Sequence, residues 1–239
     1  MATINMILQG KGGVGKSLVA SLLTQHFLES GKEVCCVDTD PVNATFAGYK
    51  KFNVTALDIM NDNDIDPRRF DTLVELMMAL PDKSEMVIDN GAATFVPLAS
   101  YLADNNVLEL LADSGHRVNL HSVVTGGQAL PDTLNGLHSL IKTFDVPIYV
   151  WLNGFFGQIT RKGKSFEEFK VYQNNTDRLA ALVHLPQKKK ETFGKDLENL
   201  LTDKMSFNEA MESSLPIMTK QRLRMIWKEV KQELLTCGL

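Results

Sequence analysis

A glycine-rich run at residues 10–17, GKGGVGKS, carries residue types that bind phosphate. It fits the pattern G-x-x-x-x-G-K-[ST], and it stands between an apolar β-type run and a helical pattern, as a phosphate-binding loop requires. Glycines let backbone N–H groups approach phosphate oxygens, and the N-terminus of the following helix adds the positive end of its dipole. Lys16 supplies a cation for the outer phosphates, and Ser17 offers a hydroxyl to magnesium. The loop residues predicted to bind a nucleotide are Gly12, Gly13, Val14, Gly15, Lys16, Ser17 and Leu18.

Three aspartates, Asp38, Asp40 and Asp89, stand at or just after the ends of apolar β-type runs. In an open parallel sheet, ligands bind beyond the carboxyl ends of the strands, so these side chains are expected near the glycine-rich loop. Carboxylates in that position can hold the water shell of Mg²⁺, which keeps several waters and takes few protein ligands. The sequence therefore predicts a magnesium site formed by Ser17 and these three aspartates.

The elements that must position these residues alternate between short β-rich runs and longer helical patterns. Strands are expected at residues 3–8, 33–37, 85–88, 117–124, 147–152 and 179–185. Helices are expected at residues 17–29, 67–79, 96–111, 130–143, 191–201, 207–211 and 220–235. This alternation predicts an α/β fold with a mostly parallel central sheet and helices on both faces. Since no repeat or linker divides the chain, residues 1–239 are expected to form a single domain.

The composition argues against an overall basic, a disulfide-linked, a secreted or a membrane-spanning protein. With 25 basic and 29 acidic residues the net charge is −4, which argues against an overall basic coat but allows one local basic face. Cys35 and Cys36 are neighbours on an expected strand and point to opposite faces, so they and Cys237 are interpreted as reduced thiols. The N-terminus lacks a secretion signal, and no apolar run approaches the roughly 20 residues that span a bilayer. These features predict a soluble, cytoplasmic protein.

Lys11 is the departure from a general phosphate-binding loop, since its side chain is not needed to form the loop and adds repulsion against Lys16. The combination K-G-G-x-G-K-S resembles the deviant P-loop of the ParA/MinD ATPases. In that family the early lysine reaches across a dimer interface to the phosphates held by the partner subunit. The resemblance implies a P-loop NTPase fold, ATP or ADP as ligand, and an ATP-sandwich homodimer in which Lys11 acts in trans.

The acidic strand ends fit the same resemblance. The run D-T-D-P at residues 38–41 looks like switch I of the family, which implies that Asp40 helps to position the attacking water and that Asp38 is a supporting ligand. The run V-I-D-N-G at residues 87–91 resembles switch II, with Asp89 on a magnesium-bound water. The chain lacks the glycine that usually follows in D-P-x-G-N and the usual proline of switch II. These departures bear on the hydrolytic details and on any water-positioning role for Asn43, and not on the nucleotide site itself.

Two further residues are candidates for adenine contact. Asn153 in L-N-G and Pro186 in H-L-P-Q each follow an expected strand. The resemblance places an asparagine and a proline at matching positions around adenine. From the residues alone, an asparagine before a glycine is typical of a turn.

Stretches along nearly the whole chain look like the TraL proteins of conjugative plasmid transfer regions, among them DTDPVNATFAGYK, VIDNGAATFVPL, VVTGGQALPDTL and IMTKQRL. This likeness implies a slow, partner-stimulated, Mg-dependent ATPase that supports conjugative DNA transfer or intracellular positioning. Two alternatives stay open. One is a DNA- or membrane-associated partitioning ATPase unrelated to transfer, and the other is a P-loop metabolic enzyme, although no substrate site for the latter is visible.

Basic groups stand out at residues 161–164 and 188–190 and along the last helix. On one shared face they would contact DNA phosphates without reading bases, and otherwise they are solvated lysines. The apolar stripe of the last helix fits a closing helix of the core better than a membrane-bound one. The expected partners are a second copy of the chain, nonspecific DNA and a conjugative transfer protein, with membrane contact less favoured. The helix carries Lys220, Arg222, Arg224, Lys228 and Lys231 beside the stripe Leu223, Ile226, Trp227, Val230 and Leu234.

Overall fold

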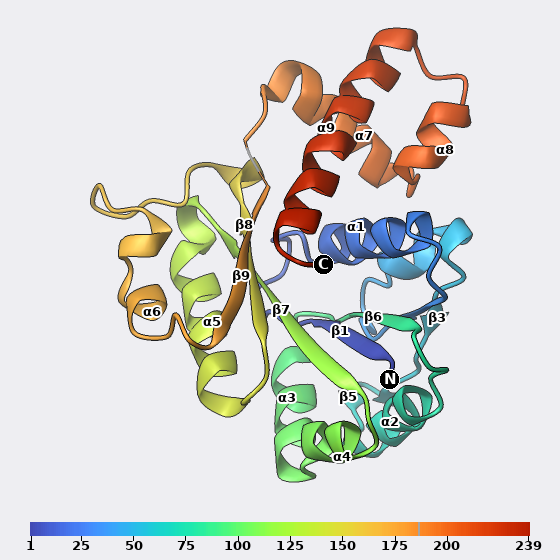
Figure 1. Cartoon of the computed structure of the whole chain (residues 1–239), viewed down its shortest axis with the longest axis vertical. Coiled ribbons are helices and arrows are strands. Elements are labelled where there is room, and N and C mark those ends of the chain that lie inside the picture. Colours follow the sequence, from blue (N-terminus) through green and yellow to red (C-terminus); the bar gives the residue numbers. More distant parts are fainter. Residues whose placement is uncertain (186) are drawn as a thin grey trace.

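A seven-stranded sheet runs through the centre of the computed structural model, which describes residues 1–185 and 187–239 (Figure 1). The strand order is β3-β2-β6-β1-β7-β8-β9, and every pair of neighbours is parallel. With helices on both faces, this sheet confirms the predicted fold class. The strands are β1 (Thr3–Ile7), β2 (Val34–Asp38), β3 (Thr55–Ala56), β6 (Glu85–Asp89), β7 (Arg117–Thr125), β8 (Ile148–Asn153) and β9 (Leu179–Leu185).

The register of the central strands brings the candidate site together. β1 lies between β6 and β7, and its last residue, Ile7, pairs with Asp89 on one side and with His121 on the other. On the next strand along, Asp38 pairs with Asp89. The loop after β1 and the aspartates that end β2 and β6 therefore meet at one carboxyl edge of the sheet, as expected for a parallel α/β fold.

Each face of the sheet carries its own apolar core and helix layer. In Figure 1, α1, α7, α8 and α9 cover one face, and α2, α3, α4 and α5 cover the other, with α6 beside α5. The helices are α1 (Lys16–Glu29), α2 (Phe70–Met78), α3 (Phe95–Asp104), α4 (Val107–Asp113), α5 (Leu130–Thr143), α6 (Lys170–Gln173), α7 (Lys195–Thr202), α8 (Phe207–Glu212) and α9 (Ile217–Thr236).

The helix α1 is buried on most of its surface because the sheet lies on one side of it and the α7–α9 layer on the other. Polar contacts join it to that layer, since the Gln25 side chain accepts from the Phe207 N–H at 2.7 Å and the Trp227 indole donates to Glu29 at 2.8 Å. The inner face of α9 is buried in this core, which confirms the interpretation of α9 as a closing helix. Its buried residues are Leu223, Ile226, Trp227, Val230 and Leu234.

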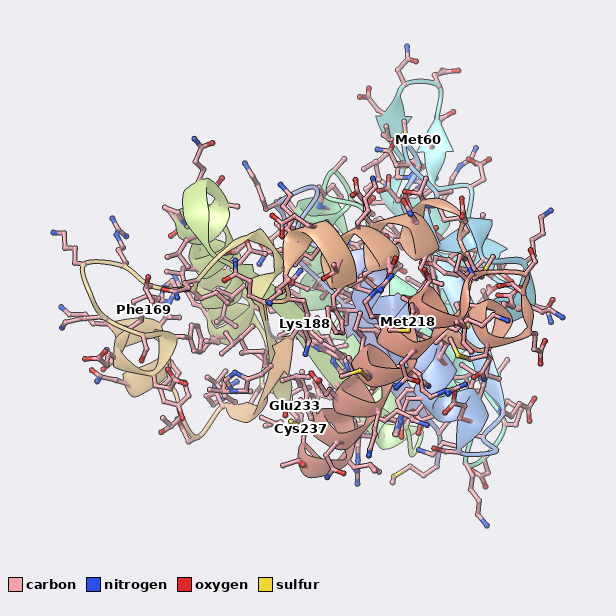
Figure 2. All side chains as sticks on the ribbon, turned by 90° about the horizontal axis from the view of Figure 1, so that it is seen from above. Met60, Phe169, Lys188, Met218, Glu233 and Cys237 are labelled. Carbon is pink, nitrogen blue, oxygen red and sulfur yellow. The ribbon has the colours of Figure 1, made fainter. Side chains whose placement is uncertain are left out.

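Some predicted elements differ from the structure. The helix expected at residues 96–111 is two helices, α3 and α4, because the chain turns at Asn105 and Asn106. Asn106 adopts φ 50°, in the left-handed region that asparagine tolerates better than most residues. A two-stranded hairpin, β4 (Met60–Asn61) with β5 (Asp64–Ile65), was not predicted. Figure 2 shows this hairpin, with Met60 labelled, projecting from the body of the molecule.

The cysteines occupy separate environments. Cys35 packs against the core on the α2–α5 side, whereas Cys36 lies in the core under α1, as predicted for neighbours on a strand. All three cysteines are free, and burial raises the pKa of the Cys36 thiol to about 12. Among the described residues, no helix has the length and apolar character needed to cross a membrane.

Candidate nucleotide-binding site

The glycine-rich loop curls over the N-terminus of α1. Gly13 and Gly15 have φ values of 74° and 104°, which side-chain-bearing residues rarely adopt. A Cβ atom at Gly15 would also lie 2.8 Å from Nδ2 of Asn153. Lys16 is buried, and its Nζ donates to the carbonyl oxygen of Lys11 at 3.0 Å. Burial lowers the pKa of Lys16, while the nearby carboxylates of Asp89 and Asp40 favour the charged ammonium.

A pocket of about 610 Å³ opens above this loop, a size suited to a small organic ligand. Six of the seven predicted loop residues line it, whereas Val14 is buried in the core. The walls come from the ends of β2, β6 and β8 and from α7. The lining residues are Gly12, Gly13, Gly15, Lys16, Ser17, Leu18, Asp40, Val42, Asn43, Thr45, Tyr49, Asn90, Ala92, Ala93, Asn153, Phe155, Leu197, Leu201 and Lys204.

Asp89 is a buried carboxylate of the site, as is Asp38. Burial raises the pKa of Asp89 to about 7, and a hydrogen bond with the Ser17 hydroxyl opposes part of that rise. Its Oδ1 atom is buried and has no hydrogen-bond partner among the described residues. Such an orphaned oxygen is costly unless a ligand or water satisfies it. A carboxylate oxygen in need of a donor, beside a hydroxyl, fits the predicted contact with a magnesium-bound water.

Asp38 and Asp40 shape the loop that follows β2. The two oxygens of Asp38 accept from the N–H groups of Asp40 and Ala47, both at 2.9 Å. Oδ1 of Asp40 accepts from the N–H groups of Val42 and Asn43 at 2.9 and 3.0 Å. Across the described parts of the chain, no three or more His, Cys, Asp or Glu side chains are arranged to hold a metal. The roles of Asp38 and Asp40 as magnesium ligands stay predictions.

The loops after β2 and β6 are in direct contact. The Thr39 hydroxyl donates to Oδ1 of Asn90 at 2.9 Å, and the Thr94 hydroxyl donates to the Thr39 carbonyl at 3.0 Å. A Cβ atom at Gly91 would lie 2.7 Å from Cγ of Asp40. A glycine is therefore required at position 91 for the close approach of the two loops.

Lys11 lies outside this pocket, although it belongs to the same loop. Its Nζ atom forms an ion pair with Oδ2 of Asp132 on α5 at 2.9 Å, and both side chains are about half exposed. The two lysines of the loop thus point in different directions, Lys16 inward and Lys11 toward α5.

Asn153, at the end of β8, holds the glycine-rich loop through a hydrogen bond to its backbone. Its side chain is buried, with Nδ2 donating to the Val14 carbonyl at 2.9 Å and Oδ1 accepting from the Phe155 N–H at 3.1 Å. These bonds give Asn153 a role in holding the loop that the sequence did not indicate. Its contact with adenine stays a prediction, and the same prediction for Pro186 falls outside the described residues.

Several residues at the site were not predicted from the sequence. Tyr49, Leu197, Leu201 and Lys204 line the pocket, and Lys204 packs over Gly48, where a Cβ atom would lie 3.0 Å from its Cγ. No motif marks these positions, because they reach the pocket only through tertiary packing. Asp132 lies in the stretch VVTGGQALPDTL, which resembled the TraL proteins but indicated no role for any single residue.

Comparison with known sequences agrees with this geometry. Residues 5–214 match the sequence model of the CobQ/CobB/MinD/ParA nucleotide binding domain. Two Escherichia coli proteins, both called Protein TraL, are similar to the chain. One is 47% identical over 237 residues, covering 98% of each chain, and the other is 48% identical over 229 residues, covering 95% of this chain and 94% of that one.

Solved structures with the same fold include the MinC:MinD cell division complex of Aquifex aeolicus, with a TM-score of 0.56, 12% identity and 96% of both chains covered. A plasmid partition protein of Borrelia burgdorferi B31 bound to AMPPNP has a TM-score of 0.55 and 17% identity, with 99% of both chains covered. The septum site-determining protein MinD of Pyrococcus horikoshii, complexed with Mg-ADP, has a TM-score of 0.54 and 18% identity over 96% of both chains. At these identities the likeness shows the fold.

Proposed function

The chain belongs to the family of CobQ/CobB/MinD/ParA nucleotide-binding domains, and from that premise we propose that it is a switch that dimerises with ATP and hydrolyses it slowly. The observation that carries this proposal is the divergence of the two loop lysines. Lys16 is directed into the pocket and Lys11 away from it. One cation serves the chain's own nucleotide, and the other is available to the nucleotide of a second copy. The likeness to the TraL proteins supports a role in conjugative plasmid transfer.

The residues that line the pocket, and Asp38 and Asp89 beside it, divide the chemistry among them. Backbone N–H groups of the loop and the Lys16 ammonium bind the phosphates. When bound, Mg²⁺ neutralises phosphate charge, and Ser17, Asp89 and, as a supporting ligand, Asp38 would hold it directly or through its waters. Asp40 stands at the pocket wall, where its carboxylate orients the attacking water and accepts a proton from it.

The ion pairs of the predicted cations bear on the proposed contact with DNA. Several of the predicted cations already have acidic partners, since Lys188 pairs with Glu229, and Arg222 and Lys231 pair with Asp196 and Glu29. The hairpin at residues 161–164 is exposed, and its turn at Lys162 and Gly163 has positive φ at both residues. None of its three cations forms an ion pair with a described residue, and this favours the hairpin as a phosphate contact.

The switch is tested by sedimentation with ATP, ADP or no nucleotide, in the presence of Mg²⁺. Wild type should dimerise only with ATP, and Lys11→Ala should stay monomeric while still binding ATP. Lys142→Ala, which removes an exposed lysine from the other end of α5, should behave as wild type. Asp40→Ala should accumulate the ATP dimer. If Lys11→Ala dimerised and hydrolysed ATP normally, the proposal would be wrong.

DNA contact is tested separately by gel shift with nonspecific duplex at low salt. We expect binding with ATP alone, and loss of binding in both Lys11→Ala and a triple alanine variant of Arg161, Lys162 and Lys164. Equal binding by the triple variant would exclude the hairpin. Absence of binding in every nucleotide state would leave a transfer protein as the partner to seek.

A further inference from the structure

We infer that Asp132 is a positioning residue for Lys11, holding the Lys11 ammonium on the chain's own surface until a second copy binds. The inference rests on the proposed ATP-dependent dimer. Its starting point is the ion pair of 2.9 Å between Lys11 Nζ and Asp132 Oδ2. Asp132 lies in the first turn of α5, where the helix dipole favours a negative charge. The same turn therefore stabilises the carboxylate that holds Lys11.

Buried contacts fix the separation of the two residues. Gln9, two positions before Lys11, donates from Nε2 to the Thr133 carbonyl at 3.1 Å. Thr133, directly after Asp132, accepts from the Thr125 N–H at 3.4 Å. Gln9 and Thr133 are both fully buried. The start of α5 is thus tied to the strand that leads into the glycine-rich loop.

Gly136 makes this attachment possible. A Cβ atom at that position would lie 2.1 Å from Oε1 of Gln9, so only glycine leaves room for the glutamine side chain. The attachment brings the Asp132 carboxylate within reach of Lys11 through rigid, buried groups. The lysine side chain is the flexible member of the pair and can leave without any change in the backbone.

The pair is suited to release. Its members are 44% and 54% exposed, and ion pairs between exposed side chains are weak. A symmetric dimer must break one such pair in each protomer before both lysines act in trans. Removing the carboxylate should therefore tighten the ATP dimer by about 2- to 30-fold, from the usual strength of two exposed pairs. Without Asp132, Lys11 has no ion pair to break, so the ATP-bound dimer should form at a lower protein concentration.

The test is the dissociation constant of the ATP dimer, measured by sedimentation for Asp132→Asn. The expected result is tighter dimerisation with ATP, no dimer with ADP, and a smaller difference from wild type at high salt. Asp132→Glu should keep the wild-type constant, and Asp113→Asn, an exposed aspartate at the end of α4, should have no effect. In a Lys11→Ala background, Asp132→Asn should change nothing. Asp132→Ser is a second neutral variant if the asparagine disturbs folding.

The outcomes separate this inference from the proposed function. If Lys11→Ala is monomeric but Asp132→Asn leaves the dimer unchanged or weakens it, Asp132 does not hold Lys11 back, and the switch itself stands. If Lys11→Ala dimerises as wild type does, the trans role of Lys11 fails, and the role of Asp132 fails with it.

Discussion

Protonation of His121 should destabilise the protein in mild acid. The His121 ring is fully buried on β7, where Nδ1 accepts from the Trp151 indole at 3.0 Å and Nε2 faces Oδ1 of Asn5 at 3.2 Å. These partners require a neutral ring that carries its proton on Nε2. Burial lowers the pKa of His121 from 6.5 to about 3. A second ring proton would cost the Trp151 bond and leave a buried charge.

The size of the effect follows from linkage. Because the folded pKa is below the unfolded one, the unfolded chain binds more protons between these values, so stability is complete above pH 6.5 and falls as the pH drops toward 3. Lowering the pH from about 8 to about 4.5 should cost roughly 3 kcal/mol from His121 alone, at about 1.4 kcal/mol per unit. For a chain of this length that corresponds to a fall of about 6–12 °C in Tm.

Urea unfolding at the two pH values measures this cost, with His121→Gln as the test variant. Glutamine can accept from Trp151 and donate to Asn5 but does not titrate, so the variant should lose about 3 kcal/mol less than wild type on acidification. His138→Gln removes an exposed histidine on α5 and should follow wild type. Parallel pH dependence in wild type and His121→Gln would show that protonation of His121 does not cause the loss of stability.

Three further predictions concern the loop and its neighbours. Asn153→Ala leaves the buried Val14 carbonyl unsatisfied and should cost about 1–3 kcal/mol of stability in urea unfolding, together with weaker ATP binding by calorimetry. Gly15→Ala forces a side chain into φ 104° against Asn153, so ATP binding should be lost, and normal affinity would contradict the geometry. Asp89→Asn should raise the Tm of the protein in EDTA, and by more above about pH 7 than near pH 5. The folded state loses stability as the pH rises from the usual pKa of 3.8 toward about 7, so only part of that loss is present at pH 5. The same variant should hydrolyse ATP more slowly than wild type, and an equal Tm gain at both pH values would exclude burial of the charge as the cause.

The parts of the site that depend on local order in the chain could be predicted from the sequence. The glycine-rich loop, the strand before it and the helix after it are consecutive, so their residue types and spacing predict their geometry together. The positions of Asp38 and Asp89 followed from the rule that parallel strands present their carboxyl ends at one edge. The register of β2 with β6 confirms that these two residues are neighbours.

Other features depend on contacts between distant segments and carry no local signal. The helical spacing of apolar residues continues across the break between α3 and α4, so the sequence pattern does not reveal the break. The structure shows it in the left-handed conformation of Asn106. Lys204 reaches the pocket because α7 packs over α1, and Asp132 meets Lys11 because a buried glutamine ties α5 to β1. Neither the helix packing nor a single long-range hydrogen bond can be read from spacing along the chain.

The joined loops after β2 and β6 have a mechanical consequence. Thr39 and Thr94 link them through hydrogen bonds, and Gly91 lies against Asp40, so the two loops share one rigid boundary. Neither loop can move without disturbing the other. A displacement of the exposed residue Val42, in the loop after β2, would therefore also move the loop after β6. A protein that bound to Val42, at the rim of the pocket, would shift the surroundings of the buried Asp89 carboxylate. For the proposed switch, this contact between the loops offers a route by which a bound partner would alter ATP turnover.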